Sequence, residues 1–359
     1  MKNGFMLAVA GCFIASASHA QSNVALSGLI DGGVSYISNQ NGHSNVKFDD
    51  GILVPNLLIF TGVEDLGGGT RAVFDLRSQF LLGNGSFPPG QSIFSRTAFV
   101  GLDNASFGRL TLGNQYDFMT DSLFSGMNDA AIYTGGLYAF RAGPFSRLNL
   151  PNNPTGNFDW DRMAGERVQN AVKYVSPICG GFSVGAMYGF GGVAGSFGAN
   201  SASSFGLNYG GNQFGANAAY TNVKSGVAGV QVSVRNWGAG AHVTLGQLTA
   251  SALFTTVHNS ENGASIWEVE AGALYFLAPD VTVGASYMYM KGNEFLDEQH
   301  AHQVAAQISY LLSKRTTIYA AGIYQRVGSG GQALISGVFD GASSSPMQSI
   351  ARVGLETKF

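Results

Sequence analysis

The charged residues of this sequence include a set whose placement could select ions. Four cations occupy polar positions of segments in which apolar and polar residues alternate: Arg71, Arg77, Arg167 and Lys173. Three carboxylates lie in a long stretch without sustained alternation: Asp117, Asp121 and Asp129. Alternation with a period of two places every second side chain on the same face of a strand. If that face lined a water-filled passage, its fixed charges would favour solutes of one sign.

The histidines give a weaker indication of function than these charged residues do. A hydrolase needs a nucleophile, a base and an orienting group on one face, and no nucleophile motif accompanies His258, His300 or His302. His300 and His302 are one residue apart, a spacing that could serve a metal, but the sequence shows no third ligand. We therefore expect no enzyme activity, no metal site and no cofactor.

The composition indicates where such a chain would fold. Charged residues make up 11% of the 359 residues, against about 25% in typical soluble domains, while glycine (51 residues) and aromatic residues (12%) are abundant. Mean hydropathy is only +0.11, and beyond residue 20 no apolar run approaches the ~20 residues of a membrane helix. This combination is typical of a membrane β-barrel. The sequence has no basic stripe, which argues against a nucleic-acid partner.

The N-terminus predicts a Sec-type signal peptide over residues 1–20. Lys2 supplies the positive charge, residues 5–15 form an apolar stretch, and Ser18-His19-Ala20 has the small-x-small pattern of a cleavage site. Cleavage would leave Cys179 as the one remaining cysteine, so that no disulfide could form within the chain.

Alternating segments recur through residues 21–359, and we count about sixteen of them. Short turns such as 65–69 and 313–315 alternate with longer loops rich in Gly, Ser and Asn, such as 191–201 and 328–347. Short turns at one end and long loops at the other are typical of outer-membrane barrels. Each segment has about 21 residues available, enough for a membrane strand of ~9–11 residues and its connection.

The C-terminus belongs to the same pattern. Ala351, Val353, Leu355, Thr357 and Phe359 share one parity, and the chain stops there. Because a bilayer cannot satisfy an open sheet edge, we expect this last strand to pair with the first and close the barrel. A soluble β-sandwich would need a second apolar layer, and the polar parity is too rich in Gly, Ser, Gln and charge to form one.

The sequence resembles the general porins of Gram-negative outer membranes, especially the β-proteobacterial type. The resemblance rests on the order and spacing of five motifs and the terminal Phe359: "GVEDLGGGTRAVFDL" (62–76), "SRTAFVGL" (95–102), "FGRLTLGNQYD" (107–117), "RVQNAVKYVSPICGGFSVG" (167–185) and "LSKRT" (312–316). It implies that residues 21–359 form a sixteen-stranded antiparallel barrel. It also implies that three copies of the chain form a homotrimer in contact with outer-membrane lipids and lipopolysaccharide. The third loop, residues 115–166, would fold inward as the constriction. Phe359 would end the strand that the barrel-assembly machinery recognises.

The sequence departs from this family at the constriction. Of the wall arginines usual there, Leu57 and Asn114 replace two, and Arg167 retains the third. Asp31, Asp75, Glu268 and Glu270 also fall on the inward parity. We therefore expect a weak transverse field and weak selectivity, tilted toward cations.

The expected function is passive diffusion of ions and small hydrophilic solutes across the cell outer membrane. Two alternatives remain open. Loop aromatics could instead favour aromatic or sugar-like solutes in a substrate-preferring channel: Tyr133, Tyr138, Phe140 and Trp160. The long loops, above all 328–347, could instead serve a surface adhesin or receptor.

Overall fold

The computed structural model describes residues 23–124, 127–138, 145, 167–335 and 341–359; the predicted signal peptide lies outside them. The strands are β1 (Asn23–Gln40), β2 (His43–Asp50), β3 (Leu57–Gly67), β4 (Thr70–Gln79), β5 (Thr97–Asn104), β6 (Gly108–Tyr116), β7 (Arg167–Val175), β8 (Phe182–Gly189), β9 (Ala202–Gly210), β10 (Phe214–Val227), β11 (Val230–Leu245), β12 (Leu248–Asn259), β13 (Ser265–Ala278), β14 (Val281–Gly292), β15 (His300–Leu311), β16 (Thr316–Val327) and β17 (Met347–Lys358). The helical elements are a π-helical turn (Met119–Phe124), α1 (Ala130–Thr134) and two 3-10 turns (Gly136–Tyr138 and Glu294–Leu296). No helix among the described residues has the length and apolar character needed to cross a membrane.

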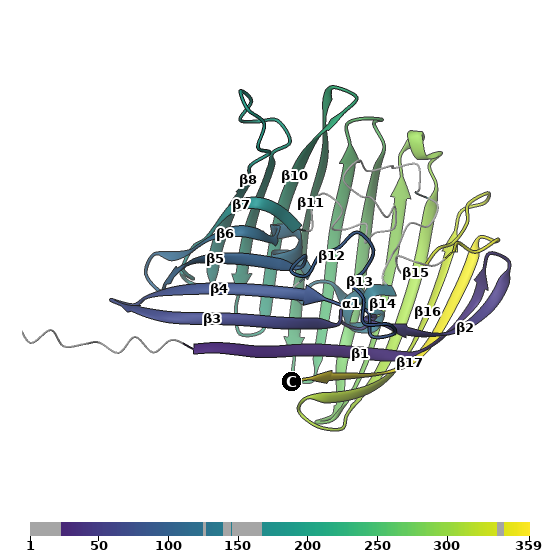
Figure 1. Ribbon diagram of the computed structural model, residues 1–359. Helices are drawn as coiled ribbons and strands as arrows, with labels where there is room; N and C mark the ends of the chain where they lie inside the picture. Colours follow the sequence, from purple (N-terminus) through teal and green to yellow (C-terminus); the bar gives the residue numbers. More distant parts are fainter. Residues whose placement is uncertain (1–22, 125–126, 139–144, 146–166, 336–340) are drawn as a thin grey trace, which may run out of the picture.

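The strands form one closed antiparallel sheet, which confirms the predicted barrel (Figure 1). β1 pairs with β2 through residues 32–40 and with β3 through residues 23–29. β2 and β3 are therefore two halves of a single barrel strand, interrupted by residues 51–56. Counted in this way, the seventeen segments make sixteen barrel strands.

Phe359 completes the closure of the barrel. The N–H of Gly28 donates to the carbonyl of Phe359 (3.0 Å), and the N–H of Phe359 donates back to Gly28 (3.1 Å). Antiparallel pairing continues from Leu29 opposite Lys358 to Ile37 opposite Ile350. Figure 1 shows β1 beside β17. The final residue thus belongs to the strand that satisfies the last open edge.

The two faces of the wall follow the predicted alternation, with polar side chains inside. On β13, Trp267 and Val269 are 38% and 44% exposed on the outer face, whereas Glu268 and Glu270 are 1% and 0% exposed. This is the reverse of a soluble β-protein, and it is the arrangement expected where lipid replaces water outside the sheet.

Part of the barrel interior is filled with apolar side chains. Met288 and Met290 of β14 pack in one buried cluster with Ala131 of α1 and with Leu334 from the last loop. Backbone N–H groups fix that loop to inward glutamines: Leu334 donates to Gln325 (2.9 Å) and Ile335 to Gln348 (2.7 Å). A segment of the loop 328–347 therefore lies inside the barrel.

Candidate functional site: the lining of the barrel interior

The chain that follows β6 is attached to the inner wall by Phe118. The ring packs over Gly185 of β8 and Gly206 of β9, which are direct partners in the ladder. A Cβ on Gly206 would lie 2.5 Å from the ring. The N–H of Phe118 donates to Ser204 Oγ (2.9 Å). The two glycines leave the space that an aromatic ring needs to lie flat on the sheet.

Asp117, predicted to face the passage, anchors this segment instead. Its carboxylate accepts the hydroxyl of Thr221 on β10 (2.7 Å) and the N–H of Thr120 (2.9 Å), and the residue is 0% exposed. Burial raises the pKa of the Asp117 carboxyl to about 6, although the two hydrogen bonds oppose the shift.

Lys173 holds the same segment from β7. Its Nζ pairs with Asp121, donates to the carbonyl of Tyr116 (2.8 Å) and lies 4.6 Å from the centroid of the Phe118 ring. The Lys173 side chain is 7% exposed, whereas that of Asp121 is 43% exposed. The cation is shielded by its partners, and Asp121 keeps solvent access.

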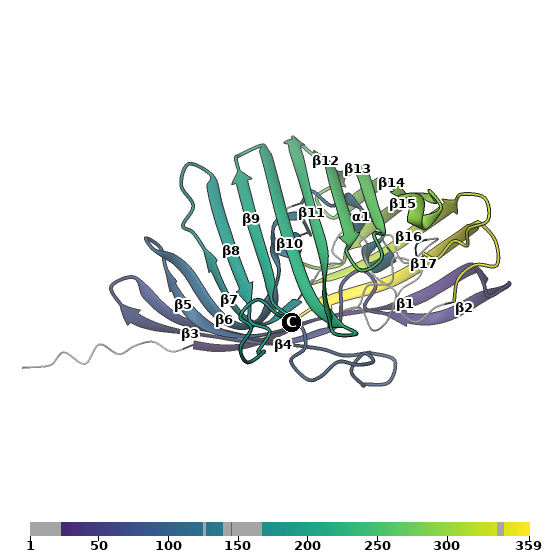
Figure 2. The same cartoon turned by 90° about the horizontal axis from the view of Figure 1, so that it is seen from above.

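Asp129 caps α1 and does not reach solvent. Its side chain accepts the N–H of Ile132 (3.1 Å), and the residue is 1% exposed. Glu270 of β13 accepts the N–H of Ala131 (3.0 Å), and the hydroxyls of Thr134 and Ser286 are 2.6 Å apart. Figure 2 shows α1 against the wall formed by β13–β15. The Glu270 carboxylate therefore binds the helix and does not face the passage.

Tyr138, at the end of the described range 127–138, attaches this segment to β1 and β2. Its hydroxyl donates to Asp49 and lies 2.9 Å from Ser35 Oγ, and its carbonyl accepts from Gln303 (3.0 Å). The N–H of Leu137 donates to Ile52 (2.5 Å), in the interruption between β2 and β3. Contacts at Phe118, α1 and Tyr138 thus attach residues 117–124 and 127–138 to the inner wall.

Two arginines lie near Tyr116 at the end of β6, and a third, Arg167, is its partner in the ladder. Arg96 donates from Nε to Gln79 Oε1 (2.5 Å) and from an Nη atom to the Tyr116 hydroxyl (3.4 Å). Arg167 begins β7 directly opposite Tyr116. Arg77 pairs with Asp75 (2.7 Å) and lies within electrostatic range of Tyr116. With Lys173 these residues form what we call the basic cluster: Arg77, Arg96, Arg167 and Lys173.

The alternating pattern of the sequence did not indicate that Arg96 belongs to this cluster. Arg96 directly precedes β5, outside the alternating pattern, so parity could not assign it to a face. Asn114, expected as a neutral position of the wall, donates its amide to the carbonyl of Ser95 (3.1 Å) and so supports the residue next to Arg96. Leu57 is buried on the inner face of β3, 8% exposed.

Arg71 lies apart from the basic cluster. It pairs with Asp103 (2.5 Å), which also pairs with Arg109 (3.1 Å). Arg71 is six residues from Arg77 on β4, which corresponds to about 20 Å along a strand. It therefore belongs to the short-turn end of the barrel interior.

His300 and His302 lie on the outer face of β15, whereas His242 of β11 reaches the interior, where its Nδ1 lies 2.8 Å from Asn128 Oδ1. His302 accepts or donates at Nδ1 with the hydroxyl of Tyr287 (2.7 Å), and its ring lies 4.8 Å from that of Tyr289. Both tyrosines are on the outer parity of β14. Within the described ranges, no three His, Cys, Asp or Glu side chains gather in a way that could hold a metal ion.

The chain matches the model of the Gram-negative porin family over residues 7–329. An outer membrane porin protein of Bordetella pertussis is 31% identical over 204 residues, which cover 53% of this chain and 48% of that protein, so the match spans about half of its length. Outer membrane porin protein 32 of Delftia acidovorans is 28% identical over 322 residues, covering 88% of this chain and 87% of that protein.

Solved structures share the fold. An anion-selective porin from Comamonas acidovorans superposes with a TM-score of 0.79 at 22% identity, covering 94% of this chain and all of that chain. The trimer form of OmpT, an outer membrane protein of Vibrio cholerae, gives a TM-score of 0.65 at 13% identity, covering 94% and 99%. At these identities the likeness shows the closed barrel itself.

Proposed function

Because this chain belongs to the Gram-negative porin family and folds as a barrel of the outer membrane, we propose that it is a passive diffusion channel with a preference for anions. Ions and small hydrophilic solutes cross the polar interior without energy coupling. A closed barrel of sixteen strands is wide enough to leave an aqueous passage beside its partly filled half.

The proposed preference for anions rests on which charged side chains of the interior are exposed. Three expected acids are consumed in structural contacts: Asp117, Asp129 and Glu270 are at most 1% exposed. In the pair Arg77–Asp75 the arginine side chain is 36% exposed and the carboxylate 9%. Two arginines share Asp103 at the short-turn end. Only in the pair Lys173–Asp121, among the interior pairs of the described residues named here, is the carboxylate the more exposed partner (43% against 7%). The remaining distribution favours anions, the opposite of the sign expected from counting the inward acids.

A salt gradient across a planar bilayer tests this proposal. We expect stepwise conductance with an anion-side reversal potential, and a shift toward cations in the double variant Arg77→Gln/Arg96→Gln. The control Arg326→Gln removes a cation from the outer face and should leave the reversal potential unchanged. Cation preference of the natural chain would reject the ion selectivity but keep the channel, whereas absence of conductance from folded protein would reject the channel.

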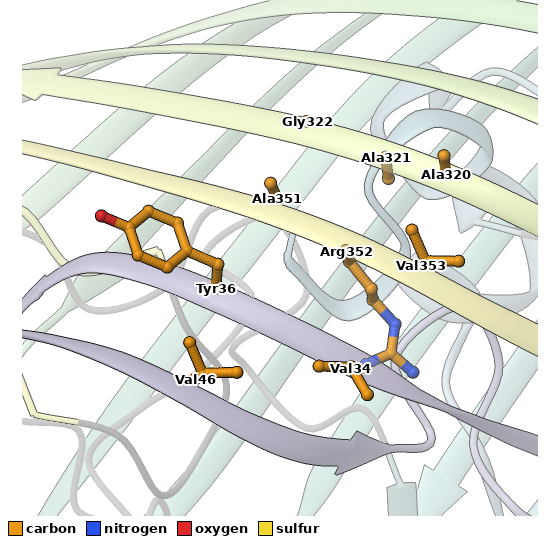
Figure 3. Close-up of a pocket in the computed structure, with 9 residues that line it drawn as sticks. All are labelled: Val34, Tyr36, Val46, Ala320, Ala321, Gly322, Ala351, Arg352 and Val353. Carbon is orange, nitrogen blue, oxygen red and sulfur yellow. The ribbon is translucent and has the colours of Figure 1, made fainter.

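The assembly that we propose is a homotrimer, formed through the outer face of β1, β2, β16 and β17. Small residues leave a hollow there: Ala320, Gly322 and Ala351 lie between Val34, Tyr36, Val46 and Val353 (Figure 3). Val34, Val46 and Val353 are 53%, 68% and 65% exposed. An exposed apolar hollow beside protruding apolar side chains suits contact with the outer face of a neighbouring copy of the chain.

Two further parts of the proposal concern the long loop and the last residue. Residues 115–166 act as the constriction, and the attachment of residues 117–124 and 127–138 to the inner wall supports this. Residues 125–126, 139–144 and 146–166 of this loop lie outside the described part of the chain. Phe359, with its ring 49% exposed on the outer face, acts as the signal for barrel assembly. Of the alternatives, stacking of solutes on loop aromatics finds no support at Tyr138, which is 1% exposed. Tyr133 is half-buried, and Phe140 and Trp160 lie outside the described residues. A receptor role of 328–347 is weakened by the burial of Ala333 and Ile335 at 0%.

A further inference from the structure

Three glutamines form a row on the inner wall, across three neighbouring strands (Figure 1). Gln303 of β15 is the ladder partner of Gln325 of β16, which is in turn the partner of Gln348 of β17. We call these residues the glutamine row, and each of them is at most 1% exposed. A buried amide side chain needs hydrogen-bond partners for both its oxygen and its nitrogen. The partners of this row therefore show what it holds in place.

The row holds the last loop through two backbone N–H groups. Leu334 donates to Gln325 Oε1 (2.9 Å), and Ile335 donates to Gln348 Oε1 (2.7 Å). Gln348 Nε2 donates in turn to the carbonyl of Asn39 on β1 (2.7 Å). Leu334 and Ile335 lie outside the strands, and buried backbone N–H groups must nevertheless be paired. The glutamines supply the acceptors that a ladder would supply in the sheet.

The same row holds the third loop. Gln303 Nε2 donates to the carbonyl of Tyr138 (3.0 Å), and Gln303 Oε1 accepts the amide of Gln325 (3.1 Å). Hydrogen bonds therefore run from Tyr138 of the third loop, through two glutamines, to Leu334 of the last loop. In such a network each bond orients the next, so that loss of one bond weakens the others.

Apolar contacts join the same two loops on both sides of the row. Ile335 and Tyr138 belong to one buried cluster, which also includes Ile323 on the short-turn side of the row. Leu334 belongs to a second buried cluster together with Ala131 of α1. Close-packed side chains transmit a displacement of one to its neighbours. The two loops thus share one packed region of the barrel interior.

We propose that the glutamine row couples the two loops, so that the last loop determines where the third loop lies and how large a solute can pass. The proposal rests on the diffusion channel proposed above. The three glutamines are uncharged, and they act on the width of the passage rather than on its preference for one sign of charge. The solutes concerned are uncharged hydrophilic molecules near the size limit of the channel.

Hydrogen exchange in folded protein in detergent, measured by mass spectrometry, tests the coupling. The variant Gln325→Ala/Gln348→Ala removes the acceptors of the last loop and leaves the bond from Gln303 to Tyr138 in place. We expect amide exchange in residues 127–138 to become about tenfold faster, because the loss of one or two hydrogen bonds raises the population of locally opened states by about that factor.

Gln307→Ala is the matched control. Gln307 lies on the same inner face of β15, nearer the short-turn end, and its amide donates to Ser309 Oγ (2.9 Å). Exchange in residues 127–138 should keep its natural rate in this variant. Ile335→Ala is a smaller change inside the shared cluster. It should accelerate exchange in residues 127–138 to a lesser extent, and it provides the same readout if the double glutamine variant does not fold.

Additivity and solute size complete the test. Gln303→Ala added to the double variant should accelerate exchange in residues 127–138 little further, because changes within one coupled network are not additive. In vesicles that contain the purified protein, the swelling rate with sucrose relative to arabinose should rise several-fold in the double variant. The reversal potential should equal that of the natural chain, because no charge is removed.

Three results would overturn the proposal. Natural exchange rates in residues 127–138 of the double variant, with faster exchange in residues 328–335, would show that the two loops are held independently. Additive effects of Gln303→Ala and the double variant would show the same. An equal effect of Gln307→Ala would assign the change to a general loosening of the wall. Absence of conductance from the natural chain would reject the channel alone, because the exchange experiment does not depend on conduction.

Discussion

Arg352 of β17 and Asp31 of β1 form an ion pair across the closure of the barrel, with Nη2 and Oδ2 3.1 Å apart and neither side chain exposed. Tyr319 joins them: its hydroxyl donates to Asp31 (2.6 Å) and accepts from Arg352 Nε (2.7 Å). Asp31 also accepts the N–H of Ile52 (2.7 Å). This network ties the last strand to the first and fixes the interruption between β2 and β3. It also removes both charges from the solute path.

Replacement of Arg352 by Gln should destabilise the barrel strongly. The change leaves the Asp31 carboxylate buried without its cation, and loss of one member of a buried pair costs about 3–5 kcal/mol. Equilibrium unfolding in urea, with detergent present, measures this cost. Arg71→Gln is the control, because its pair with Asp103 leaves the arginine 53% exposed and is worth at most about 1 kcal/mol. Equal losses in the two variants would contradict the role of the network.

Gly206→Ala should detach the segment around Phe118 from the wall. The added methyl group would lie 2.5 Å from the Phe118 ring and 2.6 Å from Ser122 Oγ, so the ring must move. We expect noisier single-channel currents and faster proteolysis between residues 117 and 138. Gly210→Ala, at the end of β9, meets no atom within 4 Å and should behave like the natural chain. Quiet currents from Gly206→Ala would show that this segment does not control the passage.

Asp117 should make stability depend on pH. The pKa of its carboxyl rises from 3.8 to about 6 on burial, so the folded protein binds this proton more tightly than the unfolded chain does. The stabilising contribution of Asp117 to the free energy of unfolding is complete below about pH 4 and is lost as the pH rises through about 6. Relative to the Asp117→Asn variant, the free energy of unfolding of the natural chain should fall by about 3 kcal/mol between pH 4 and pH 8.

Urea unfolding at pH 4, 6 and 8 checks this expectation. Glu294→Gln removes an exposed carboxylate and should leave the pH profile of the natural chain unchanged. A constant difference between the natural chain and Asp117→Asn across this range would mean that Asp117 ionises in the folded protein as it does in the unfolded chain.

Phe359→Ala should reduce the amount of folded barrel in the outer membrane several-fold. The backbone pairing with Gly28 survives the change, but the ring that lies over Gly28 is lost. The fraction of heat-modifiable, folded protein in isolated outer membranes measures the effect. Phe205→Ala removes another outward ring, 52% exposed on β9, and should have little effect. Equal yields from the two variants would count against Phe359 as an assembly signal.

The sequence by itself determined the wall of this protein. Alternation requires only that every second side chain face the same side, and this local rule placed Glu268, Trp267 and Arg352 on their correct faces. The need to satisfy every backbone group in a bilayer then closed the sheet between the first strand and Phe359. Both arguments use information within a strand or at its ends.

Only the tertiary structure decided which charges reach the passage. Parity assigned Glu270 to the interior but could not show that Ala131 would use its carboxylate, because that contact joins residues 139 positions apart. Arg96 lies outside any alternating segment, so its place beside Tyr116 depends on how β4 and β6 are spaced across β5. The burial of Ile335 depends likewise on a glutamine of another strand. Exposure inside a barrel is set by what packs across it, and no local pattern in the chain records that distance.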